Sequence, residues 1–187
     1  MFLPSLITSG ENIQGLDNLS DGGQINLITN ACTSFLKSRF SINNPTDIPH
    51  IVSSNKIKNF SAIPKLKTIR IPMDKALQNL EALEFTLLHE YGHLCYPNTE
   101  THESEEFWAD RFATRYATNT KTIDAVFKSM DQENRRKYGL NILRQLHECP
   151  AKPPLESSNS LISYIKQEAK LQRTDAAEKS HRWEKPA

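Results

Sequence analysis

The first half of the chain shows two hydrophobic periods, and each period predicts a different kind of element. Apolar side chains recur at helical spacing in residues 21–40, which predicts a first helix. Residues 48–53 and 66–71 alternate in the manner of strands, and residues 57–63 suggest a third strand. We therefore expect one helix followed by a small sheet.

The second half of the chain is predicted to be helical, because its apolar positions return every three to four residues. The clearest run, residues 75–95, precedes a second predicted helix at residues 103–118. Further helices are predicted at residues 122–130, at residues 132–147 and, as a short amphipathic segment, at residues 160–171. A proline-rich break at residues 149–154 interrupts this series, and the polar C-terminal end is expected to be disordered.

This order of elements predicts an α+β fold that is mostly helical, with a small sheet ahead of the helix at residues 75–95. A length of 187 residues favours a single domain with a proper core. We place that domain at residues 1–150. Residues 151–187 would then hold the proline-rich break, the short helix and the polar tail.

Composition limits which cellular compartment and which class of protein are expected. No apolar run approaches the ~18 residues of a membrane-spanning helix, and the N-terminal residues lack the basic and apolar regions of a signal peptide. The three cysteines, Cys32, Cys95 and Cys149, are too few and too widely spaced for a disulfide framework. A cytoplasmic protein is expected, and export by a route without a cleavable signal stays open.

Charge is nearly balanced overall but unevenly distributed. Residues 22–73 carry seven basic groups against one acidic group, whereas residues 74–110 carry nine acidic groups against one basic group. Part of this acidity suits a bound dication, and the rest is interpreted as solvated helix surface. The basic half resembles no base-reading module, so nucleic-acid binding is not expected.

The most informative motif is His89-Glu90-Tyr91-Gly92-His93, near the end of the predicted helix at residues 75–95. Residues four apart lie on the same face of a helix, so both imidazoles can reach one metal ion. Glu90 would then accept a proton from a water on that ion. Gly92 does not favour a helix, but it suits a face that another element or a substrate approaches closely.

A catalytic zinc site usually takes three protein ligands and keeps one position for water. Helical geometry alone leaves five candidates for the third ligand on the next helix: His102, Glu103, Glu105, Glu106 and Asp110. The buried face of that helix is predicted to hold Trp108, Ala109, Phe112, Ala113 and Tyr116. Asp110 lies one turn beyond Glu106, and such a pair suits a ligand together with an acceptor that orients a ligating histidine.

Residues 85–93, followed by residues 106–113, resemble the HExGH…ExxAD/N-x-F-A pattern of the gluzincins. The short spacing is most similar to the ImmA/IrrE-type metallopeptidases. The resemblance implies a minimal zincin-like domain that binds Zn²⁺ through His89, His93 and Glu106, with Glu90 as the catalytic base and Asp110 as a companion of the ligands. It also implies that residues 68–71 form the edge strand of the cleft, which would then carry Arg70.

Several other residues are interpreted as structural. His102 is read as an exposed loop histidine, and Tyr91, Tyr96 and Tyr116 as core or rim aromatics. Cys95 is expected to be a buried small hydrophobe. His147 lies far along the chain, and the sequence does not show whether it returns to the cleft. No residue is assigned to stabilise an oxyanion.

These observations favour a zinc-dependent endopeptidase that hydrolyses a specific protein substrate. One alternative is a non-catalytic zincin scaffold that acts by binding a protein partner. Another is a helical interaction protein in which the motif is fortuitous. The presence of Glu90 favours the enzyme, because a purely structural metal site has no need of a base.

Overall fold

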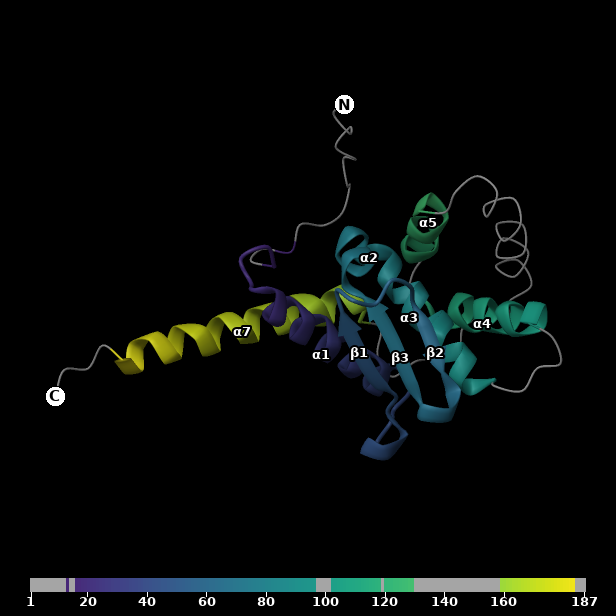
Figure 1. Cartoon of the computed structure of the whole chain (residues 1–187), viewed down its shortest axis with the longest axis horizontal. Coiled ribbons are helices and arrows are strands. Elements are labelled where there is room, and N and C mark those ends of the chain that lie inside the picture. Colours follow the sequence, from purple (N-terminus) through teal and green to yellow (C-terminus); the bar gives the residue numbers. More distant parts are fainter. Residues whose placement is uncertain (1–12, 14–15, 97–101, 119, 130–158, 184–187) are drawn as a thin grey trace, which may run out of the picture.

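The computed structural model describes residues 13, 16–96, 102–118, 120–129 and 159–183 (Figure 1). Along the chain the elements are α1 (Asp21–Arg39), β1 (His50–Ser54), β2 (Ser61–Ile63), β3 (Thr68–Pro72), α2 (Met73–Gln78), α3 (Leu80–Cys95), α4 (His102–Tyr116), α5 (Thr120–Ser129) and α7 (Leu161–Trp183). The predicted α+β fold, mostly helical with a small sheet ahead of the motif helix, is confirmed. The helix predicted at residues 132–147 and the break at 149–154 lie outside the described residues.

The three strands lie in the order β1-β3-β2, so β3 is the central strand. It pairs in parallel with β1 and antiparallel with β2, and Ile69 is opposite both Ile51 and Ala62. The expectation that residues 68–71 form an edge strand was therefore wrong, and β2 is the edge strand beside the site described below. Burial accounts for the order, because Ile69 and Ile71 are fully buried whereas every residue of β2 is half-buried.

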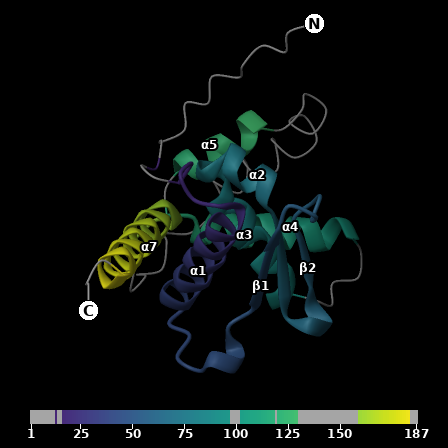
Figure 2. The same ribbon diagram turned by 60° about the vertical axis from the view of Figure 1, so that its left-hand side comes forward.

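Helix α3 lies at the centre of the molecule. It contacts strands β2 and β3 on one side and helices α4, α5 and α7 on the others, while α1 packs between β1 and α7 (Figure 2). The Thr29 hydroxyl of α1 donates a hydrogen bond of 3.0 Å to Ser53 of β1. The core between these layers is apolar and includes Phe35, Leu87 and Leu88, each fully buried. The motif helix is thus held on several sides.

The helix predicted at residues 75–95 is divided in two at Asn79. This residue leaves the helical conformation, and its side-chain oxygen accepts a hydrogen bond of 3.1 Å from the backbone N–H of Ala82. Asparagine is among the best N-cap residues because its side chain replaces a missing backbone acceptor. The chain therefore turns at Asn79, and α3 starts in a new direction.

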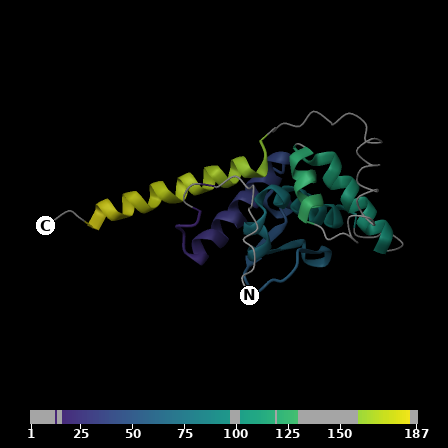
Figure 3. The ribbon, with the colours of Figure 1, turned by 90° about the horizontal axis from the view of Figure 1, so that it is seen from above.

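Helix α7 is longer than predicted. It spans 23 residues, from Leu161 to Trp183, so much of the tail expected to be disordered is helical. Leu161 and Ile165 are fully buried in the core that they share with α1 and α3. The C-terminal half of α7 extends beyond the other elements (Figure 3). No described helix is long and apolar enough to cross a bilayer.

Glu84 of α3 joins three helices, a contact that the hydrophobic pattern did not predict. The side chain is 3% exposed. One carboxylate oxygen accepts hydrogen bonds of 2.6 Å from both the backbone N–H and the hydroxyl of Thr118, and the other accepts one of 2.9 Å from the backbone N–H of Leu161. The carboxylate thus fixes the end of α4 and the start of α7 against α3.

Replacing Glu84 with alanine is expected to lower the free energy of unfolding by about 3 kcal/mol, because the half-buried donors of Thr118 and the buried N–H of Leu161 lose a charged acceptor. Urea unfolding followed by circular dichroism measures this change. Glu168→Ala in α7 is the matched control and is expected to change stability by less than about 0.5 kcal/mol. A loss below about 1 kcal/mol for Glu84→Ala would mean that water replaces the carboxylate.

Candidate metal centre

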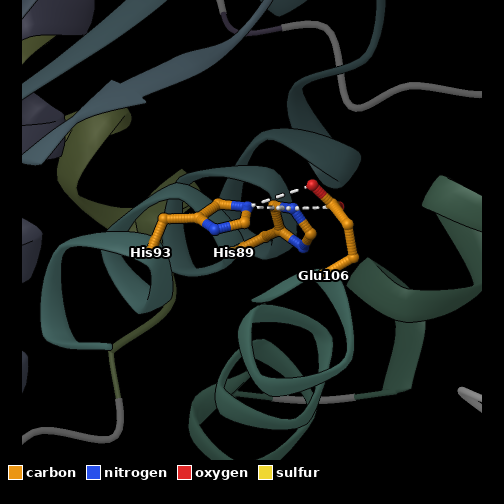
Figure 4. A group of neighbouring side chains, drawn as sticks. All are labelled: His89, His93 and Glu106. Atoms are coloured by element: carbon orange, nitrogen blue, oxygen red, sulfur yellow. Dashed lines mark hydrogen bonds and ion pairs between the residues drawn. The ribbon is translucent and has the colours of Figure 1, made fainter. Parts of the chain in front are cut away.

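Three side chains from two neighbouring helices converge on one point (Figure 4). His89 and His93 project from successive turns of α3, and Glu106 reaches them from α4. Their nitrogen and oxygen atoms all lie within 4.8 Å of one another. This group could hold a metal ion.

The separations of these atoms fit a tetrahedral ion. Ligands at ~2.0–2.1 Å from a tetrahedral zinc stand ~3.3–3.4 Å from one another. The Nε2 atoms of His89 and His93 are 3.1 Å apart. A Glu106 carboxylate oxygen lies 3.3 Å from His89 Nε2, and the other lies 3.5 Å from His93 Nε2. Without an ion the two nitrogens share a hydrogen bond at this distance, and the same spacing is the one that a tetrahedral cation would require.

Asp110 contacts the side of the His89 ring that faces away from Glu106. One of its carboxylate oxygens lies 2.8 Å from Nδ1 of His89, on the opposite side of the ring from the metal-facing Nε2. Asp110 is buried and lies one turn after Glu106 on α4. A carboxylate in this place keeps the proton on Nδ1 and leaves Nε2 free to ligate. Glu106 and Asp110 therefore lie on opposite sides of the His89 ring, which is the placement that a ligand and an orienting carboxylate would need.

Replacing Asp110 with asparagine is expected to weaken metal binding by about 10- to 100-fold, because Nδ1 of His89 loses its charged partner. Competition with a chromogenic zinc chelator measures the change in Kd. Asp124→Asn, at an exposed site on α5, is the control and is expected to leave the Kd unaltered. Equal affinities for the wild type and Asp110→Asn would show that the ring is oriented by packing alone.

Gly92 allows α3 and α4 to approach closely enough for these contacts. A Cβ atom at this position would lie 3.0 Å from the Ala109 Cα atom and 3.1 Å from the Phe112 Cβ atom, both on α4. The first neighbour is a backbone atom, so a side chain at position 92 would require α4 to move away from α3 by a few tenths of an ångström. This confirms the expectation that the glycine serves a close approach, and the approaching element is α4.

Hydrogen bonds within the centre shift the pKa values of His89 and Glu106. Burial by itself lowers the pKa of His89, but hydrogen bonds with Asp110 and Glu106 outweigh it and raise that pKa to about 10. Hydrogen bonds from both histidines hold the pKa of Glu106 well below its usual range. A cation at this point would have to displace a proton from His89, so its affinity should rise with pH.

Glu90 lies beside the three convergent side chains but is not one of them. It is 7% exposed, and burial raises the pKa of its carboxyl group. The positive charges of His89 and His93, and a hydrogen bond from the backbone N–H of Ala62 in β2, oppose that rise. A carboxylate with a raised pKa beside a metal position is suited to accepting and returning a proton.

A cavity of about 450 Å³ opens over the centre. Its lining comes from the edge-strand segment, from α3 and its C-cap, and from the start of α4: Phe60, Ser61, Ala62, Pro64, His89, Glu90, His93, Tyr96, Glu105 and Glu106. The metal position, the candidate base and the open edge of the sheet therefore share one space.

Several sequence-based candidates lie elsewhere. Glu105 lines the cavity but does not belong to the convergent group. Arg70 is exposed on the central strand and is not among the residues that line the cavity, contrary to expectation. His102 begins α4 and is not a loop residue as expected. The side chains of His102 and Glu103, and the whole of His147, lie outside the described residues.

The predictions for the aromatic and cysteine side chains are confirmed in part. Tyr91 and Tyr116 pack on Phe40 and Phe112, and Tyr96 lies at the cavity rim, which confirms their reading as core or rim. Cys95 is exposed rather than buried, because α3 ends there at the surface. Trp108 is 39% exposed, so its place on the buried face was also wrong.

Comparisons with protein-family models, curated proteins and solved structures found no match to this chain. Its function is therefore inferred from the residues of the site and from their geometry.

Proposed function

We propose that the protein is a zinc-dependent endopeptidase with a zincin-like catalytic domain, acting on a specific protein substrate. The observation that carries this proposal is the combination of a three-ligand centre with a separate buried carboxylate, Glu90, in the same open cavity. A structural zinc site is usually closed by four protein ligands, whereas a catalytic site keeps a position for water or substrate.

Each residue of the site would have a separate role in the reaction. His89, His93 and Glu106 would hold the ion, which lowers the pKa of water bound to it and polarises a carbonyl oxygen. Glu90 accepts a proton from the attacking water as the peptide carbonyl is attacked, and returns that proton to the leaving amine. Asp110 fixes the ring of His89 throughout, so the ligand keeps one tautomer.

The edge strand gives the substrate a place to lie. Ser61 and Ala62 of β2 line the cavity, and β2 pairs with β3 on one side only. An extended peptide can add to such an edge through main-chain hydrogen bonds, which would carry a scissile bond past Glu90. An extended protein segment is therefore the substrate class that this geometry favours.

New N-termini in a cell lysate test this proposal. The lysate is incubated with zinc-loaded wild-type protein or with zinc-loaded Glu90→Gln protein, and N-terminal peptides are compared by mass spectrometry. Cleavage sites that appear only with the wild type support the proposal. If both zinc-loaded proteins leave the lysate unaltered, the protease assignment fails and a non-catalytic binding scaffold becomes the better interpretation.

A further inference from the structure

A second, smaller cavity adjoins the metal cavity, and the two share Tyr96. It has a volume of about 180 Å³ and lies between one face of α4 and the C-cap of α3. Its lining consists of aromatic rings and two arginines: Tyr96, Trp108, Arg111, Phe112, Arg115 and Tyr116. None of these residues ligates the metal centre, so the proposed chemistry gives this cavity no role.

The two arginines are held in place by aromatic rings. The guanidinium of Arg111 lies 5.5 Å from the centre of the Trp108 ring, and that of Arg115 lies 5.8 Å from the centre of the Tyr116 ring. Tyr96 stacks on Trp108 at 6.0 Å between ring centres. It also lines the metal cavity, so it is the residue that both cavities share. Stacking of this kind orients a guanidinium while leaving its N–H edge available to a ligand.

These charges have no acidic partner within the described part of the chain. Neither Arg111 nor Arg115 forms an ion pair with a described carboxylate, and the Nε atom of Arg115 is buried without a hydrogen-bond acceptor. A buried donor without an acceptor costs stability and calls for an explanation, such as an absent ligand. Two arginines one helical turn apart suit a carboxylate, which accepts their N–H groups through both oxygens.

The neighbouring metal cavity has the opposite character. Glu90, Glu105 and Glu106 line it, and the charge of three carboxylates exceeds that of one bound dication, so an acidic substrate side chain is not favoured there. The same side chain is attracted a short distance away, beyond Tyr96, by Arg111 and Arg115. The difference in charge between the two cavities would therefore determine the direction and the register in which an acidic peptide binds.

We propose that the cavity between Tyr96, Trp108, Arg111 and Arg115 is a specificity subsite that takes an aspartate or glutamate side chain of the protein substrate. This inference rests on the proposed peptidase function for its biological meaning. The binding itself requires no turnover, because the subsite shares no residue with the ligands or with Glu90. The two proposals can therefore fail separately.

The fluorescence of Trp108 tests the subsite directly. Of the two tryptophans in the chain, Trp183→Phe removes the other, so Trp108 becomes the sole reporter. In this background, with Glu90→Gln and zinc, a capped tetraglutamate peptide is titrated against a capped tetraglutamine peptide. We expect saturable binding that is at least about tenfold tighter for tetraglutamate, as hydrogen bonds between charged groups would give.

Substitutions in the same background identify the groups responsible. Arg111→Gln with Arg115→Gln is expected to reduce tetraglutamate binding to the tetraglutamine level, whereas Arg173→Gln, at an exposed site on α7, leaves it unchanged. Arg115→Lys keeps the charge and the fold but loses the guanidinium geometry, so it should give intermediate binding. Because no cleavage is measured, this result is the same whether or not the lysate experiment yields products.

Three outcomes would overturn the subsite. Equal affinity for the two peptides would show that the cavity does not distinguish a charged side chain from a neutral one. Tetraglutamate binding that survives the double arginine substitution would place the peptide elsewhere. Inorganic phosphate that binds more tightly than tetraglutamate, and competes with it, would assign the arginines to a phosphate group instead of an acidic side chain.

Discussion

Glu90→Gln protein is expected to bind zinc like the wild type and to lose about 100- to 10,000-fold in kcat/KM, the usual contribution of a positioned proton acceptor. The amide nearly matches the carboxyl group in size but cannot take a proton from water. Glu90 lies outside the group formed by His89, His93 and Glu106, so its substitution leaves the ligand atoms in place. Inductively coupled plasma mass spectrometry measures the zinc content, and cleavage of a substrate found in the lysate measures activity.

Glu105→Gln is the matched control for this experiment. Glu105 lines the same cavity and changes charge in the same way, but it does not converge with the metal-facing side chains. We expect full zinc content and a change in kcat/KM of less than about tenfold. If zinc-replete Glu90→Gln protein cleaves as fast as the wild type, Glu90 is not the proton acceptor.

His93→Ala protein is expected to lose both the metal and the activity. Only His89 and Glu106 would remain to hold the ion, and two ligands from adjacent helices do not satisfy a tetrahedral cation. Zinc at about 100 times its Kd should stabilise the wild type by about 2.7 kcal/mol, which raises Tm by roughly 5–10 °C in a chain of this length. Differential scanning calorimetry with and without zinc should show this rise for the wild type and none for His93→Ala.

His50→Ala provides the control for the loss of a histidine. His50 is exposed on β1, away from the residues that line the cavity, and its replacement is expected to keep the zinc-dependent rise in Tm. An undiminished rise for His93→Ala would locate zinc binding at other residues. The chelator-treated wild type should unfold like His93→Ala with no added zinc.

The sequence predicted the local parts of this site because they depend on short-range geometry. The two histidines occupy one face of α3 since residues four apart on a helix always do, whatever surrounds it. The glycine at position 92 signalled a close approach for an equally local reason, the absence of a Cβ atom. The order of the described elements followed from hydrophobic period alone, apart from the break at Asn79 and the length of α7.

The long-range parts were beyond such reasoning. Five polar side chains at the start of α4 were equivalent by spacing, and the resemblance to a family, not geometry, favoured Glu106 among them. How α4 packs on α3 determines that Glu106 meets the histidines while Asp110 lies behind His89. The strand order β1-β3-β2 likewise depends on which residues the core buries most fully, which a period of two does not reveal.

The sequence by itself therefore determined the element types, the two histidines on one helical face and the carboxylate between them. Only the tertiary structure decided which acidic residue completes the centre, that β2 forms the edge strand of the cavity, that Glu84 joins three helices, and that two arginines lie beside Tyr96. The physical reason is distance along the chain. Backbone geometry fixes neighbours within a helical turn, but contacts between helices depend on the packing of the whole core.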